Sequence, residues 1–208
     1  MTTSRAFEAI GKKLASHLDG FVVKGPLMAI CPIGHVLRGL YFEPSAFDSE
    51  SFYVSVFFQP LLVPSKVIGL NMGRRLPGPW NANDPDLIQR LLVVVTQDAL
   101  PFLERVGTLR GAAEMAEQMA KASKDLYALQ AAAYLATLAG DTAGAREALE
   151  RLLQILDTKV PWQREMAARA KMLLQQTIEG HPHAICWLEG WEKETAANLG
   201  IVELCQVG

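Results

Sequence analysis

The sequence predicts an α+β protein: an N-terminal antiparallel sheet of four or five strands flanked by helices, then a C-terminal bundle of about five helices in hairpins. Short segments before residue 60 alternate apolar residues with a period of two, which is typical of strands. After residue 107 the apolar residues recur every three or four positions over longer segments, which is typical of helices. Strands grouped first and helices later favour an antiparallel sheet. We expect two domains, residues 1–107 and 108–208, packed against each other.

The segment Asp84–Val106 predicts one long amphipathic helix between the two halves. Its apolar side chains fall on one face at spacings of three and four: Leu87, Ile88, Leu91, Leu92, Val95, Ala99, Phe102, Leu103 and Val106. Asn83 or Asp84 is the expected N-cap. Pro101 should kink the helix or begin a new one, because its ring clashes with the carbonyl of Gln97.

Strands are expected before this helix, after a first helix that carries Phe7 and Leu14. The predicted strands are Phe21–Lys24, Leu27–Cys31, His35–Glu43 and Ser51–Gln59, with Lys66–Met72 as a candidate fifth. Ser51–Gln59 is apolar on both faces, so it should lie in the middle of the sheet. Arg74–Asn83 is rich in proline and glycine and is expected to be a loop.

Five helices are expected in the second half. Their predicted bounds are Thr108–Lys121, Asp125–Ala139, Thr142–Asp157, Trp162–Glu179 and Pro182–Leu199. Alanine is abundant in the first three, which allows helices to approach closely. The tail Ile201–Val207 is expected to be a short strand or packed coil.

Composition limits the class of protein. Half of the 208 residues are hydrophobic, and the net charge is −2. Residues 1–107 carry +1 (ten basic minus nine acidic) and residues 108–208 carry −3 (ten minus thirteen), so neither half predicts a nucleic-acid surface. The three cysteines are an odd number at unrelated spacings, which favours a reducing compartment. With no signal-peptide pattern and no apolar run of about 18 residues, we expect a soluble cytoplasmic protein without a membrane span.

Residues 126–157 resemble a tetratricopeptide-type helical hairpin. The matching positions are the small residues Ala132, Ala133 and Ala136, the turn Gly140-Asp141, and then Ala145, Leu149 and Leu152. A glycine at the turn can end one helix in a left-handed conformation, and Asp141 can cap the next. No second copy follows at a constant period, so an ordinary helical hairpin is an equal alternative. The resemblance implies protein or peptide binding. The layout as a whole also resembles small bacterial proteins that include toxin-immunity proteins.

Two groups of side chains are candidate binding residues. Arg74 and Arg75 precede Trp80 in the expected loop, where they could hold a carboxylate or phosphate and stack a ring. Trp187 and Trp191 lie one turn apart on the last helix. If they are buried, we expect them to pack in the core. If they are exposed, we expect them to anchor a partner.

Histidine and cysteine provide weaker candidates for chemistry. His181, His183 and Cys186 lie within six residues and are candidate metal ligands, although no second ligand motif accompanies them. Cys31 and His35 could form a thiolate–imidazole pair, but the apolar segment around Cys31 should raise the pKa of its thiol. We expect no cofactor and no catalytic residue.

Three functional classes follow from the sequence. The leading hypothesis is a non-enzymatic protein-binding module, an immunity protein or an adaptor, whose partner is another protein such as a toxin or effector. The second is an enzyme without a recognisable motif, with His35, His181, His183 or Cys186 as its reactive groups. A structural subunit that buries apolar faces in a homo-oligomer is the third.

Overall fold

In the computed structural model, residues 3–179 and 181–205 are described, without the side chains of residues 178–182 and 205. The chain forms two compact units. The sheet unit comprises Met1–Gln59, Ile68–Arg105 and Ile201–Gly208, and the helical unit comprises Pro60–Val67 and Val106–Gly200. Both units therefore contain residues from more than one part of the sequence.

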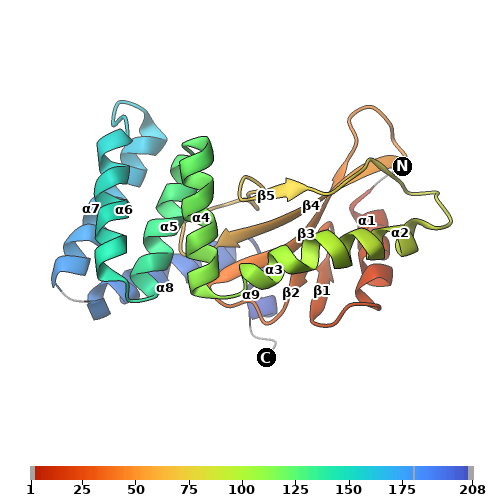
Figure 1. The fold of residues 1–208 in the computed structure, drawn as a ribbon, viewed down its shortest axis with the longest axis horizontal. Coiled ribbons are helices and arrows are strands. Elements are labelled where there is room, and N and C mark those ends of the chain that lie inside the picture. The colour runs from red at the N-terminus through yellow and green to blue at the C-terminus, as the bar shows by residue number, and fades with distance from the viewer. Residues whose placement is uncertain (1–2, 180, 206–208) are drawn as a thin grey trace. The chain divides into compact units, whose positions relative to one another are not determined.

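The sheet unit contains one antiparallel sheet with strand order β1-β2-β3-β4-β5, and β6 also pairs with β4 (Figure 1). The strands are β1 (Phe21–Lys24), β2 (Leu27–Ile30), β3 (Val36–Pro44), β4 (Ser51–Pro60), β5 (Gly73–Arg75) and β6 (Trp80–Asn81). The α+β class and the antiparallel sheet are thus confirmed. β4 is the longest strand and is buried over most of its length, as its two apolar faces predict.

Helices cover one face of this sheet. These are α1 (Ser4–Ala15), α2 (Leu87–Val94), the π-helical segment η1 (Val95–Ala99) and α3 (Leu100–Arg105). Their apolar sides pack on alternate residues of the strands: Met28, Leu40, Phe42, Phe52, Val54 and Val56. Phe7 of α1 stacks against Phe42 with ring centroids 6.0 Å apart. This layer supplies the main core of the unit.

Pro101 lies just after the π-helical segment, so the long helix is irregular where the sequence predicts a disturbance. The Leu100 N–H bonds to the carbonyl of Val95, five residues back. The wider turn accommodates a residue that has no N–H to donate. The predicted cap is wrong, because α2 begins at Leu87 after Asp86. Asp84 instead accepts a hydrogen bond from the Asp86 N–H and pairs with Arg90.

Three other predicted elements differ from the structure. Lys66–Met72 is not a strand, and the expected loop Arg74–Asn83 instead contains most of β5 and all of β6. Those short strands form because β4 is ten residues long and offers backbone groups that need partners. The tail forms a one-turn helix, α9 (Val202–Cys205), and the Leu204 carbonyl accepts a hydrogen bond from the Ile33 N–H.

The helical unit contains the five expected helices in sequence (Figure 1). They are α4 (Leu109–Ser123), α5 (Leu126–Leu138), α6 (Thr142–Ile155), α7 (Pro161–Glu179) and α8 (His181–Asn198). α5 is buried around most of its circumference, because α4, α6 and α8 all pack against it. Its side chains include a buried glutamine and a buried tyrosine, Gln130 and Tyr134.

The turn between α5 and α6 has the geometry that its sequence predicts. Gly140 has a left-handed φ of 79°, where a side chain would be strained. The Asp141 N–H bonds back to the Ala136 carbonyl at 3.0 Å, which closes α5. The Asp141 carboxylate then accepts from the Gly144 N–H at 3.0 Å and caps α6. The two helices therefore form a tight antiparallel hairpin.

Candidate functional site

Arg74 and Arg75 point to opposite faces of the sheet, because neighbouring strand residues alternate. Arg74 lies opposite Val56 and donates to the backbone carbonyl of Asp98 at 3.1 Å. The guanidinium of Arg75 lies on the other face, 4.4 Å from the Tyr53 ring centroid and 3.5 Å from the Glu43 carboxylate. The two arginines therefore do not form one clamp for an anion.

Trp80 is in β6, on the helix-covered face, and only 6% of it is exposed. The Arg90 guanidinium lies 5.6 Å from its ring centroid. A shallow pocket of about 380 Å³ beside it is lined by Pro77, Gly78, Pro79, Val93 and Val94. The indole Nε1 is buried, and no described atom accepts its hydrogen bond. Trp80 is thus a core residue at the wall of a small pocket and is not an exposed stacking platform.

The two tryptophans of α8 have different environments. Trp191 is 8% exposed and stacks on Tyr134 with ring centroids 5.4 Å apart, so it belongs to the core of the helical unit. Trp187 is 44% exposed and lies 6.3 Å from the Trp191 ring. Only Trp187 is therefore accessible enough to contact a partner.

The described candidate metal ligands of the sequence lie on the surface of α8. His183 and Cys186 are both exposed on α8, and the side chain of His181 is outside the described residues. Across residues 3–179 and 181–205, no group of three or more histidine, cysteine or acidic side chains is arranged to hold a metal ion. Burial raises the pKa of the Cys31 thiol, as its apolar surroundings predict, and this reduces the thiolate fraction.

Two adjoining pockets, which share Arg151 in their linings, lie along α5 between α4 and α6, and we call them together the groove. The first is an acidic pocket of about 300 Å³. Its floor is formed by the small side chains Ala132 and Ala136 of α5. The walls carry charged side chains from α4, from α6 and from the N-cap of α6: Glu114, Glu117, Lys121, Asp141, Glu147 and Arg151. Because the floor is alanine, a ligand backbone can come close to α5 there.

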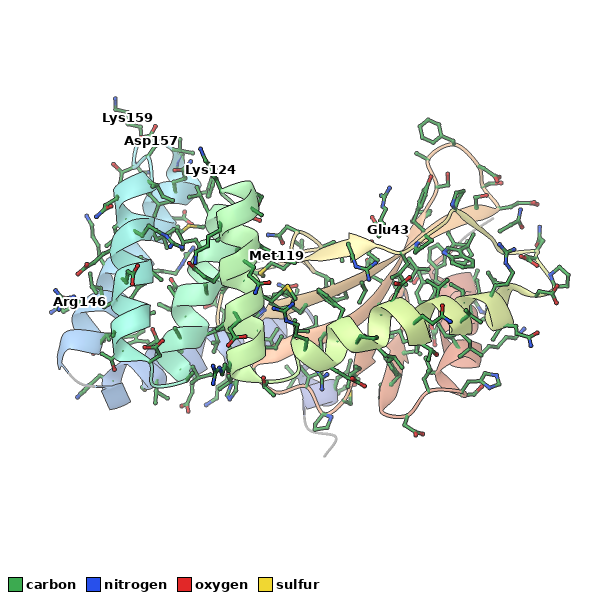
Figure 2. The ribbon with its side chains drawn as sticks, viewed as in Figure 1. Glu43, Met119, Lys124, Arg146, Asp157 and Lys159 are labelled. Atoms are coloured by element: carbon green, nitrogen blue, oxygen red, sulfur yellow. The ribbon has the colours of Figure 1, made fainter. Side chains whose placement is uncertain are left out.

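The second section of the groove is a larger and more apolar pocket of about 510 Å³. It lies where α4 ends, α5 begins and α6 ends. Leu126, Leu129 and Ile155 supply most of its apolar surface, and Lys124 and Arg151 border it. Figure 2 shows Lys124 at this end of the helical unit, near Asp157 and Lys159 of the α6–α7 connection.

A salt bridge separates the two pockets. The Arg151 guanidinium of α6 donates two hydrogen bonds to the Glu117 carboxylate of α4, at 3.0 and 2.9 Å. Lys121 lies 3.2 Å from the same carboxylate. The hydrogen bonds from Arg151 lower the pKa of Glu117, against the opposing effect of partial burial. The bridge ties the groove walls together and leaves little free positive charge in the acidic pocket.

Three large apolar side chains are exposed at the end of the helical unit that holds the apolar pocket. Tyr127 is in the first turn of α5, Ile155 is the last residue of α6, and Trp162 is in the first turn of α7. They are 45%, 52% and 41% exposed. The Tyr127 and Trp162 rings stack with centroids 5.4 Å apart and planes 10° apart. We call these three residues and the apolar pocket the apolar end.

The sequence did not identify the apolar end as a candidate site. The three exposed side chains are separated by up to 35 positions and meet only because each of the helices α5, α6 and α7 runs antiparallel to the one before it. The available signal is weak: an aromatic residue lies close to a predicted helix start, with Tyr127 two residues after Asp125 and Trp162 at the start itself. Neither position breaks the apolar periodicity strongly enough to indicate exposure.

Replacing Glu117 with glutamine should lower the free energy of unfolding at pH 7 by about 0.5–1 kcal/mol, since the pair is only partly buried. The pKa of Glu117 is lower in the folded chain than its ordinary value of 4.5. The ionised carboxylate therefore stabilises the folded state above pH 4.5, and this stabilisation is lost as pH falls below that value. Urea unfolding at pH 7 and pH 3 measures both effects. Glu150→Gln, which breaks the exposed pair with Arg146, is the control and should lower the free energy of unfolding by a smaller amount. Equal losses in the two variants would contradict the role assigned to the bridge.

No family model, curated protein or solved structure matches the chain. The resemblance of residues 126–157 to a tetratricopeptide-type hairpin stays a prediction. Within the described residues, no helix is both long and apolar enough to cross a membrane.

Proposed function

We propose that the chain is a protein-binding module whose partner docks on the apolar end of the helical unit. The observation that carries this proposal is the gathering of Tyr127, Ile155 and Trp162 beside an apolar pocket of about 510 Å³. Contiguous exposed apolar surface is uncommon on soluble proteins and marks sites of interaction. Tryptophan and tyrosine are also the residues most enriched among those that dominate binding energy.

The stacked pair is suited to this role in a second way. Each ring is held by the other, so little side-chain freedom would be lost when a partner covers them. The adjacent pocket can receive an apolar side chain of the partner, and Lys124 at its rim stays in contact with water. This arrangement of an apolar centre with a charged rim supports binding to another protein.

The partner class that we propose is a separate folded protein, as an immunity protein or an adaptor would bind. Burial of the three side chains on docking would contribute several kcal/mol before the costs of association. A toxin or effector held in this way would be neutralised by coverage of its surface, with no chemistry required of the module.

Site-specific photo-crosslinking in the cells that make the protein tests this proposal. A benzophenone amino acid placed at Ile155 should give one discrete adduct with another protein. The control places the same residue at Arg146, which points away from α4 on the opposite side of α6 (Figure 2). We expect no adduct from position 146. The same adducts from both positions, or none from position 155, would contradict the proposal. An adduct between two copies of this chain would show that the surface serves self-association and not binding to a separate protein.

A further inference from the structure

We propose that the groove binds an extended segment of the partner with two anchoring side chains about three residues apart, an apolar one in the apolar pocket and a basic one in the acidic pocket. This inference rests on the proposed function and adds the chemistry that the partner must present. It follows from the charges, the floor and the spacing of the two pockets.

The acidic pocket favours a cation. Its lining contains four carboxylates and two basic groups, a sum of −2. Both basic groups, Lys121 and Arg151, are held by Glu117. Glu147 is exposed and forms no ion pair with any described residue, and Glu114 is paired only with Arg110, whose side chain is 88% exposed. Glu147 and Glu114 are therefore available to an arginine or lysine side chain of a ligand.

The apolar pocket has the opposite preference. Most of its surface is apolar, and the Arg151 guanidinium at its border is already held by Glu117. A leucine-sized side chain would cover Leu126 and Leu129, whereas a basic side chain would lose its hydration against them. The two pockets thus distinguish one end of a ligand from the other.

The spacing of the pockets sets the ligand conformation. The linings are offset by about six or seven residues along α4 and α6, which corresponds to about 10 Å at the helical rise. A polyproline II segment places the side chains of residues i and i+3 on one side, about 9 Å apart. A helix, whose diameter is about 10 Å, would place only its side chains in these hollows, and its backbone would stay away from the alanine floor. An extended segment that crosses the Glu117–Arg151 bridge fits best.

Titration of the ¹⁵N-labelled full chain with short blocked peptides, followed by NMR, tests this inference. The probe is acetyl-Leu-Pro-Pro-Arg-amide, in which the prolines favour the extended conformation, together with its reversed sequence. The first control replaces the arginine with glutamate, and the second removes one proline so that the spacing is two. The resonances to follow are the amides of Ala132, Ala136 and Gly144, which lie in the acidic pocket.

We expect the arginine peptide, in one of its two directions, to bind at least fivefold more tightly than either control and to shift those amides. In the double variant Glu114→Lys, Glu147→Lys, the glutamate peptide should bind more tightly than the arginine peptide. In the variant Arg146→Glu, which changes the far side of α6, the arginine peptide should still bind more tightly than the glutamate peptide. Equal binding of the arginine and glutamate peptides, no binding of any peptide, or shifts elsewhere would overturn the inference. An adduct at Ile155 would still support the proposed function, so the two failures can be told apart.

Discussion

Replacing Gly39 with alanine should lower the free energy of unfolding by about 3 kcal/mol or more. Gly39 is in β3 opposite Ala29 of β2, and a Cβ atom added there would lie 2.1 Å from the Met28 carbonyl oxygen. It would also lie 2.9 Å from the Ala29 Cα. Both neighbours are backbone atoms, so no change of rotamer relieves the clash and the two strands must separate. Chemical unfolding measures the loss.

Gly34→Ala is the matched control in the same unit. A Cβ at Gly34 would meet no described atom within 4 Å, so this change should alter the free energy of unfolding by less than about 0.5 kcal/mol. Equal stability of the two variants would show that β2 and β3 are not paired as closely as the structure has them.

Stability should fall steeply between pH 10 and pH 12 because of Tyr134. This side chain is fully buried in α5, and burial raises its pKa from 10.0 to about 12. Between these values the unfolded chain releases the phenolic proton but the folded chain keeps it, so unfolding becomes more favourable as pH rises. A shift of this size corresponds to about 3 kcal/mol at most. Urea unfolding at pH 9 and at pH 12 measures this loss.

Tyr134→Phe should remove most of this pH dependence. At pH 7 it should cost about 1–2 kcal/mol, because the amide of Gln130 loses the hydroxyl that accepts its hydrogen bond at 2.9 Å. Tyr127→Phe is the control, because it removes a hydroxyl from a half-exposed ring outside the buried core. If the free energy of unfolding of Tyr134→Phe falls between pH 9 and pH 12 as much as that of the wild type, Tyr134 is not the cause of the pH dependence.

The elements of the fold could be predicted from local patterns wherever one pattern dominated. The two-residue alternation of β4 and the Gly140-Asp141 turn are encoded by neighbouring residues, and the structure has both. The segment after β4 could not be predicted in the same way. Its prolines and glycines indicate a loop, but β5 and β6 form because β4 supplies unpaired backbone groups. That information lies in a strand some twenty residues earlier.

The predicted binding residues show a second limit of local reasoning. Arg74 and Arg75 are adjacent in sequence and were expected to act together, but residues in one strand point to opposite faces. Trp187 and Trp191 lie one turn apart, and only Trp191 faces the core. Adjacency therefore suggested a single site where the structure has separate environments.

The groove and the apolar end could not be predicted from sequence, because they depend on contacts between distant residues. Glu117 and Arg151 are 34 residues apart and meet only when α4 and α6 both pack on α5. Tyr127 and Trp162 are likewise 35 residues apart, and their stacking depends on α5 and α7 being parallel neighbours at one end. Sites of this kind require the packing of three helices to be known.

The most direct test of the proposed docking surface is the dissociation constant of the crosslinked partner, measured with purified full-length proteins. Ile155→Asp places a charge at the apolar end and should weaken binding at least tenfold, because a carboxylate would be buried against apolar surface. Arg146→Ala should change the dissociation constant less than twofold. Thermal melting should confirm that both variants fold. Wild-type affinity in Ile155→Asp, with the fold intact, would contradict docking at the apolar end.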